Sequence, residues 1–186
     1  MALRAADPPA GATAPVEVAP LRRRHLRAVL RIEAQVYPRP WSLGLFMSEL
    51  ALRSTRAYRV ARSGTTVVGY GGLMLAGPDA HVTTLAVSPA HQRRGIGTLL
   101  LADLARVARE RGCRNLTLEV RVGNRAAQRL YAAFGFVPAG IRKNYYVETN
   151  EDALIMWAND IDTAAYAARL ARLTGTRAAR LAPPAG

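Results

Sequence analysis

The sequence of 186 residues is poor in cysteine, in lysine and in long apolar runs. Its one cysteine, Cys113, excludes an internal disulfide and suits a reducing compartment, so we expect a cytoplasmic location. No apolar stretch approaches the roughly 18 residues that a membrane-spanning helix needs. The leader MALRAADPPAGATAP contains no hydrophobic segment typical of a signal peptide. We therefore expect no membrane association.

Negative charge is also scarce, because 26 basic residues face 13 acidic ones and give a formal net charge of +13. Lys143 is the only lysine, and the other basic residues are arginines. The excess would suit an RNA-rich or acidic neighbourhood, although no motif indicates specific nucleic-acid binding. His25, His81 and His91 lack the spacing of metal ligands, so we expect no metal site and assign these histidines no catalytic role.

Apolar residues repeat with periods that predict one α+β domain over residues 16–160. Strands are expected where apolar and polar residues alternate, and helices where apolar residues recur every three to four positions. The order predicts a central mixed, mostly antiparallel sheet flanked by helices. The expected strands are 16–21, 55–62, 66–76, 81–87, 115–121, 136–147 and 153–160, and the expected helices are 21–37, 42–52, 96–112 and 124–135.

The helix expected from Ile96 has a strongly amphipathic pattern. Leu100 and Leu104 belong to its apolar face, whereas Asp103 and Glu110 fall on the opposite, polar face. We therefore expect Asp103 to lie opposite the apolar face of this helix.

Both ends of the chain differ from this domain in composition. Residues 1–15 are rich in alanine, proline and glycine, which predicts a disordered leader. Residues 161–186 form a basic tail rich in alanine and arginine. Two alternatives remain open for this tail: a short helix carrying Tyr166, Leu170 and Leu173, or a loosely docked or disordered segment.

The stretch QRRGIG, at residues 92–97, connects the strand TTLAV to the helix that begins at Ile96. It is not a P-loop, because GxxxxGK[ST] is absent, and it lacks the third glycine of the dinucleotide-binding fingerprint. A glycine turn at a helix N-terminus presents free N–H groups, and the helix dipole favours an anion there. Gly95 and Gly97 allow close approach, and Arg93 and Arg94 add positive charge. A structural turn without a ligand is the alternative reading.

QRRGIG resembles the Q/R-x-x-G-x-G/A motif of the GCN5-related N-acetyltransferases (GNAT), and the resemblance covers about residues 16–159. The later segments LEVRVGNRAAQRLYAAFGF, IRKNYY and EDALIM resemble the RimI-type ribosomal-protein-alanine N-acetyltransferases. The resemblance implies a GNAT fold and acetyl-CoA as the co-substrate. It also implies that the strand before the turn contacts the pantetheine arm and that the turn holds the pyrophosphate. The implied cofactor-binding residues are Leu85, Ala86, Val87, Arg93, Arg94, Gly95, Ile96, Gly97, Thr98 and Asn124.

The same resemblance implies a general base at Glu119 and a general acid at Tyr131. A free carboxylate, with a pKa of about 4.3, is a weak base for an amine, so we expect Glu119 to act through a water or to be partly buried. Without the resemblance, Glu119 could pair with Arg121, and Tyr131 could pack in the core. The implied acceptor contacts are Trp41, Asn144, Tyr145 and Tyr146.

Amine chemistry favours an N-terminal acceptor over lysine. An α-amine is about one-seventh neutral at pH 7, whereas lysine is neutral only about once in 2,500 molecules. We therefore expect acetylation of the N-terminal peptide of a ribosomal protein, one beginning with alanine, and a basic surface suited to the vicinity of the ribosome. The alternatives are acetylation of protein lysines or of a small amine such as a polyamine or an aminoglycoside. A non-enzymatic acyl-CoA-sensing or RNA-associated module is a further alternative.

Overall fold

The alternating segments form one seven-stranded sheet, in the order β1-β2-β3-β4-β5-β7-β6. The computed structural model describes residues 15–175. Within this range β4 and β5 are the parallel pair, and every other neighbouring pair is antiparallel. The predicted mixed, mostly antiparallel sheet is confirmed. The strands are β1 (Val16–Pro20), β2 (Arg56–Ser63), β3 (Thr66–Ala76), β4 (Asp79–Val87), β5 (Asn115–Arg121), β6 (Val137–Tyr146) and β7 (Glu151–Ala158).

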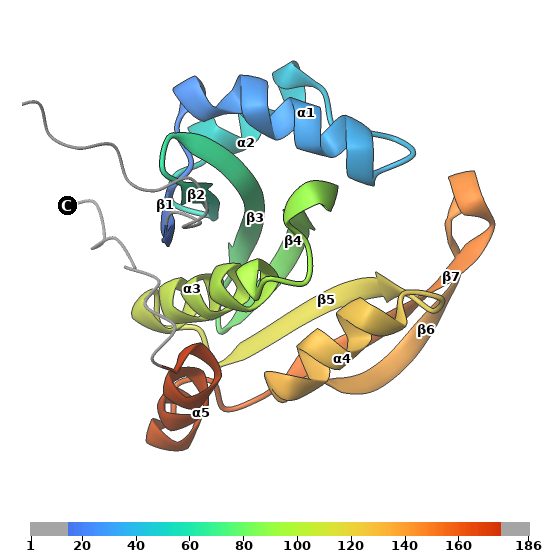
Figure 1. The fold of residues 1–186 in the computed structure, drawn as a ribbon. Helices are drawn as coiled ribbons and strands as arrows, with labels where there is room; N and C mark the ends of the chain where they lie inside the picture. The colour runs from blue at the N-terminus through green and yellow to red at the C-terminus, as the bar shows by residue number, and fades with distance from the viewer. Residues whose placement is uncertain (1–14, 176–186) are drawn as a thin grey trace, which may run out of the picture.

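The helices cover both faces of this sheet (Figure 1). One apolar cluster joins α1 and α2 to β2, β3 and β4, and the remaining clusters join α3 and α4 to the sheet's other face. Ser42 and Asn124 cap α2 and α4, each accepting a hydrogen bond from the backbone N–H three residues later. The helices are α1 (Leu26–Val36), α2 (Leu43–Ala51), α3 (Ile96–Glu110), α4 (Arg125–Ala133) and α5 (Ala164–Thr174).

Asp103, expected opposite the apolar face of α3, is not exposed to solvent. Its side chain is fully buried on α3, where it accepts hydrogen bonds from Arg59 of β2 and from Arg106. The pattern within the helix could not reveal Arg59, which the sheet brings under α3 from a distant segment. The buried carboxylate is tolerated because two guanidinium groups compensate its charge.

The chain after β7 returns to the core. Ile161 is fully buried and Tyr166 is 6% exposed, and α5 packs beside α3. The predicted leader up to residue 14, and the tail from residue 176, lie outside the described residues. No helix within residues 15–175 is long and apolar enough to cross a membrane.

The sheet opens between β4 and β5, and this opening positions the site. The two strands pair only from Asp79↔Asn115 to His81↔Thr117. Beyond that point β4 continues beside β3, and β5 continues beside β7, so the strands diverge (Figure 1). The register between β3 and β4 shifts at the same level and leaves Thr83 as an extra residue, a bulge that bends β4 away.

Candidate active site

A groove of about 780 Å³ lies where β4 and β5 separate. This volume is in the range of small-molecule binding sites. Its walls come from the α1–α2 connection, from both diverging strands, from the start of α4 and from the β6–β7 connection. The sequence-predicted residues that line it are Trp41, Leu85, Glu119, Asn124, Tyr131, Tyr145 and Tyr146.

The Glu119 side chain is 10% exposed and has a partner on each carboxylate oxygen. Oε2 lies 2.5 Å from Nε2 of His81, and Oε1 lies 3.3 Å from a guanidinium nitrogen of Arg142. The alternative pairing of Glu119 with Arg121 is wrong, because Arg121 bonds Glu151 instead. A strand alternates its faces, but which partner a side chain meets is decided by the neighbouring strands.

Tyr131 packs in the core and also lines the groove. The residue is 8% exposed, and its ring centroid lies 5.8 Å from that of Phe136. Burial raises the pKa of the Tyr131 phenol well above its ordinary value, with smaller contributions from Tyr37 and Tyr146. The phenol is therefore protonated at neutral pH, as a proton donor must be.

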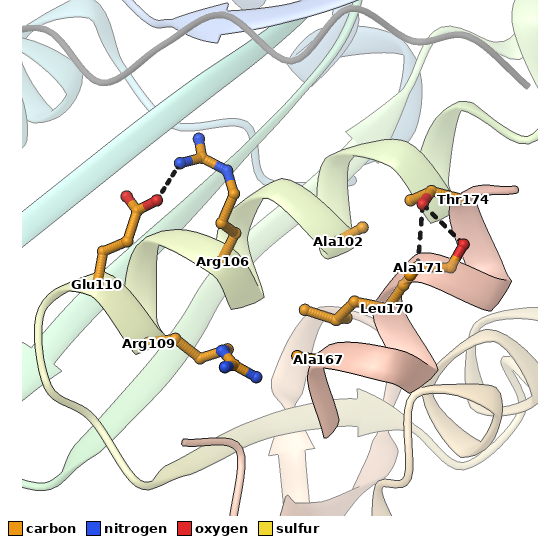
Figure 2. A pocket seen from close by; sticks show the side chains of 8 residues that line it. All are labelled: Ala102, Arg106, Arg109, Glu110, Ala167, Leu170, Ala171 and Thr174. Carbon is orange, nitrogen blue, oxygen red and sulfur yellow. Dashed lines mark hydrogen bonds and ion pairs between the residues drawn. The ribbon is translucent and has the colours of Figure 1, made fainter. Parts of the chain in front are cut away.

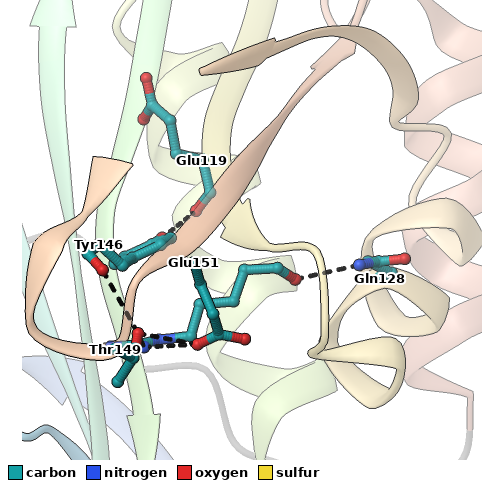
Figure 3. Close-up of polar contacts among 6 residues, drawn as sticks. Glu119, Gln128, Tyr146, Thr149 and Glu151 are labelled. Atoms are coloured by element: carbon teal, nitrogen blue, oxygen red, sulfur yellow. Dashed lines mark hydrogen bonds and ion pairs between the residues drawn. The ribbon is translucent and has the colours of Figure 1, made fainter. Parts of the chain in front are cut away.

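A polar network ties the end of β5 to α4 and to the β6–β7 connection (Figure 3). Arg121 donates to Thr149 and to Glu151, and its guanidinium lies 4.3 Å from the Tyr146 ring centroid. Gln128 of α4 donates to the Arg121 carbonyl at 3.0 Å. The Tyr146 hydroxyl donates to the Glu119 carbonyl at 3.4 Å, while the Glu119 carboxylate extends away from this cluster. The network fixes the groove wall without engaging that carboxylate.

Asn144 is placed outside the groove lining, unlike its neighbours Tyr145 and Tyr146. It has a positive φ of 49°, and its N–H donates to Asp152 at 2.8 Å. Asp152 also accepts from Lys143. The β6 register is interrupted here, and the resulting bulge directs the two tyrosines that follow.

The glycine turn lies at the start of α3, beyond the end of β4. Gly95 has a left-handed φ of 81°, and no side chain caps the helix there. The first N–H groups of α3 are therefore available to an anion. Arg93 and Arg94 are exposed, whereas the Ile96 side chain is buried and can offer only its backbone. A Cβ on Gly97 would lie 3.4 Å from Leu130, so this turn adjoins α4.

Leu85, Ala86 and Val87, the last three residues of β4, differ in their contacts. Leu85 lines the groove, and its carbonyl accepts a hydrogen bond from the Tyr37 hydroxyl at 3.2 Å. The Ala86 side chain is buried in the core, and the Val87 carbonyl accepts from the Gln92 amide at 3.2 Å. The Leu85 and Val87 carbonyls therefore each have a side-chain partner, and each carbonyl oxygen can accept a second hydrogen bond.

Among the groove residues that were not predicted as site residues from the sequence are His81, Glu33 and Tyr37. His81 falls on the same alternating pattern as the rest of its strand, but only the β4–β5 register reveals its contact with Glu119. Glu33 is 1% exposed and accepts the Trp41 N–H at 2.8 Å. Burial raises the pKa of Glu33, and that hydrogen bond partly opposes the rise. Burial also raises the pKa of Tyr37.

A second hollow, of about 500 Å³, lies between α3 and α5 (Figure 2). It contains none of the sequence-predicted site residues. Arg109, one of its lining residues, donates to the Thr163 carbonyl, and Arg106 bonds Asp103 and Glu110. Within residues 15–175, no group of three or more histidine, cysteine, aspartate or glutamate side chains could hold a metal ion.

The groove therefore combines an imidazole–carboxylate pair and a protonated phenol, and the uncapped N-terminus of α3 follows β4, which forms one of its walls. Such a set can move a proton from a nucleophile, donate one to a leaving group and bind an anionic carrier. These are the requirements of group transfer from a phosphate-bearing thioester to an amine.

Comparisons with known proteins agree with this chemistry. The model of the acetyltransferase (GNAT) family matches residues 26–136. N-alpha-acetyltransferase RimI of Mycobacterium tuberculosis is 39% identical over 150 residues, which cover 77% of this chain and 92% of the relative. The [ribosomal protein bS18]-alanine N-acetyltransferase of Escherichia coli is 35% identical over 141 residues, covering 75% and 94%.

Solved structures show the same architecture. The crystal structure of the Escherichia coli ribosomal-protein-S18-alanine N-acetyltransferase has a TM-score of 0.71 and 32% identity, covering 78% of this chain and 94% of that one. The yncA structure from Salmonella typhimurium, solved with acetyl-CoA, has a TM-score of 0.70 at 18% identity, covering 78% and 94%, and this likeness concerns the fold. The chain belongs to the GNAT family of acetyltransferases.

Proposed function

We propose that this protein transfers an acetyl group from acetyl-CoA to the N-terminal α-amine of a ribosomal protein that begins with alanine. The observation that carries the proposal is the placement of Glu119 and Tyr131 in one groove at the β4–β5 opening. The names of the Mycobacterium tuberculosis and Escherichia coli relatives support the same acceptor class.

Acetyl-CoA would bind at the junction of β4 and α3. The uncapped amides of residues 93–98 would hold its pyrophosphate, because Gly95 is left-handed and Gly97 has no side chain to obstruct approach. Arg93 and Arg94 would add charge from solvent. The backbone of residues 85–87 would contact the pantetheine arm, and Asn124 would contact CoA while capping α4. The bound molecule supplies the acetyl thioester.

Glu119 would act on the amine side of the reaction and Tyr131 on the thiol side. The acceptor must lose a proton before its nitrogen can attack, and the departing thiolate must gain one. Tyr131 remains a phenol at neutral pH because burial raises its pKa. The phenol can therefore donate its proton to the thiolate.

The acceptor peptide would enter past Trp41, Tyr145 and Tyr146, with Asn144 beside the entrance. A cationic small molecule would need free carboxylates, but Glu33 accepts the Trp41 N–H and Glu148 pairs with Arg39. The engaged carboxylates favour a peptide over a polyamine or aminoglycoside.

The composition of the chain supports a location for this activity. The net charge of +13 supports action close to the ribosome, and the single cysteine supports a cytoplasmic location.

Intact-mass measurement of an alanine-starting ribosomal peptide, incubated with acetyl-CoA and the protein, tests the function. We expect one added acetyl group on the α-amine, located by fragmentation. Glu119→Gln and Tyr131→Phe should each lower kcat by about 10² to 10⁴, the contribution typical of a general acid or base.

Both variants must still bind acetyl-CoA, which excludes misfolding as the cause of a loss. Product formed only on lysine, or no product on any α-amine, would refute the acceptor assignment. Undiminished turnover by both variants would refute the residue roles but leave the acceptor assignment intact.

A further inference from the structure

His81 and Glu119 are in direct contact inside the groove. Their side chains approach to 2.5 Å, between His81 Nε2 and Glu119 Oε2. The His81 side chain is 25% exposed and that of Glu119 is 10% exposed, so the carboxylate lies deeper than the ring. Both residues line the groove, and the imidazole is the more accessible of the two.

The fold places this contact at the apex of the β4–β5 opening. His81 pairs with Thr117 in the last position of the parallel ladder. Glu119 follows Thr117 by two residues, on the same face of β5. The pair therefore marks the point where the strands separate and the groove begins.

Glu119 is poorly arranged to accept a substrate proton by itself. One of its oxygens contacts His81 and the other lies 3.3 Å from Arg142. A proton placed on either oxygen would weaken one of these contacts. An imidazole whose Nε2–H donates to a carboxylate keeps a lone pair on Nδ1, and this lone pair can accept a proton.

We propose that His81 is the general base of the acetyl transfer and that Glu119 orients its ring and stabilises the imidazolium. This inference rests on the proposed function. An imidazole is a stronger base than a carboxylate, which suits the removal of a proton from an α-amine at neutral pH. The division of roles is the one in which a buried carboxylate fixes the tautomer of a catalytic histidine.

The protons and bonds balance as follows. The acceptor ammonium gives one proton to His81, and the freed lone pair forms an N–C bond to the thioester carbonyl carbon. The C–S bond then breaks, and Tyr131 gives its proton to the thiolate. The attacking nitrogen gives its second surplus proton to the Tyr131 phenolate, which restores the phenol. His81 then releases its proton to water.

Several charged or titratable groups lie around His81. Glu119 of β5 contacts the ring, and Arg142 of β6 contacts Glu119. On β3, the residue opposite His81 is the uncharged Met74. The other titratable or charged groove residues are Glu33, Tyr37, Arg39, Arg121, Tyr131, Tyr145, Tyr146 and Glu148.

The test uses His81→Gln, because the glutamine amide can still donate to Glu119. We expect kcat on the alanine-starting peptide to fall by about 10² to 10⁴, with unchanged KM for the peptide and unchanged acetyl-CoA affinity. The wild-type kcat should rise with pH and then level off once the general base is deprotonated. The variant should lose that plateau, because hydroxide then replaces the base.

A second acceptor separates proton removal from positioning. A peptide with an N-terminal aminooxyacetyl group carries an amine that is neutral at pH 7 without any base. The His81→Gln defect should shrink on this acceptor, whereas a merely structural defect would persist. His91→Gln, a histidine outside the groove lining, should behave as wild type on both acceptors.

An unchanged kcat and pH profile in His81→Gln, or a defect of equal size on both acceptors, would overturn the inference. His81→Asn provides a second variant if the glutamine protein does not fold. If the wild-type protein acetylates only lysine peptides, the proposed function fails, and the kcat and pH-profile comparison on a lysine peptide still decides the role of His81.

Discussion

At the scale of single residues, the groove depends on buried polar groups whose partners are backbone atoms. Glu33 illustrates this: it lies on α1, is 1% exposed and accepts the Trp41 N–H at 2.8 Å. The bond holds the connection between α1 and α2, which carries the predicted acceptor contact Trp41. Ionising a buried carboxylate costs free energy, so the free energy of unfolding should depend on pH through Glu33.

The comparison of wild type with Glu33→Gln tests this pH dependence of the free energy of unfolding. The pKa of Glu33 is raised in the folded protein, whereas a glutamate in the unfolded chain has a pKa of about 4.3. In the pH range between these two pKa values, the folded state keeps the Glu33 proton and the unfolded chain has lost it. The wild-type free energy of unfolding should therefore fall relative to Glu33→Gln as pH rises above about 4.3, and the difference should become constant above the folded pKa. Urea unfolding of both proteins from pH 4 to pH 8 measures it.

Glu33→Ala serves as the matched variant, because it also removes the acceptor. It should lose about 1–3 kcal/mol of unfolding free energy, the cost of an unsatisfied buried donor, whereas glutamine still accepts the Trp41 N–H. A wild-type protein that gained stability over Glu33→Gln with rising pH would contradict the stated balance between burial and hydrogen bonding.

At the scale of elements, the start of α3 determines whether the chain can hold an anion. Gly95 has a φ of 81°, and no side chain occupies the helix N-terminus. At the other end of the same helix, Gly112 has nearly the same φ, 79°, and a Cβ added there would have no neighbouring atom within 4 Å. A side chain would strain both glycines equally, but only Gly95 lies in the turn that is proposed to hold the pyrophosphate.

Gly95→Ala and Gly112→Ala should each lose about 1–2 kcal/mol of stability, because a left-handed conformation is unfavourable for alanine. Only Gly95→Ala should raise the KM for acetyl-CoA, by about tenfold, since about 1.4 kcal/mol of lost binding corresponds to that factor. Thermal unfolding and steady-state kinetics give the two readouts. An equal change of KM in both variants would show that the turn does not hold the pyrophosphate.

Much of the secondary structure could be predicted from the sequence. Alternation predicted the strands, three- to four-residue periodicity predicted the helices, and the side chains of Ser42 and Asn124 predicted two helix starts. These signals are local, since each depends on neighbours within a few positions. The fold class and the order of elements followed from them.

The contacts between elements could not be predicted in the same way. The pairing of His81 with Glu119 depends on the register of β4 against β5 across an intervening helix. The burial of Asp103 depends on Arg59 in a distant strand. Asn144 adjoins Tyr145 in sequence, yet the bulge held by Asp152 separates it from the groove lining. Local periodicity carries no information about these partners.

At the scale of the whole molecule, the charge is unbalanced. The chain has 26 basic residues and 13 acidic ones, and many described carboxylates already contact an arginine, including Glu17, Glu49, Asp103, Glu110, Glu119, Glu148 and Glu151. The uncompensated charge is therefore positive, and it creates a field that extends beyond any single ion pair. Such a field attracts a polyanion such as ribosomal RNA more strongly than it attracts a short peptide.

Salt dependence separates this long-range attraction from recognition in the groove. If the protein acts close to the ribosome, kcat/KM on an acceptor within a ribosomal particle should fall by about tenfold or more between 50 and 200 mM salt, because counterions compete for the RNA phosphates. The free N-terminal peptide of the same acceptor should lose much less, since it presents no phosphate array. Equal salt sensitivity on both acceptors would place the electrostatic contribution inside the groove, and insensitivity on both would leave the net charge without a role in acceptor encounter. Either result would remove the argument for ribosome proximity, while acetylation of the peptide itself would continue to depend on the residues at the β4–β5 opening.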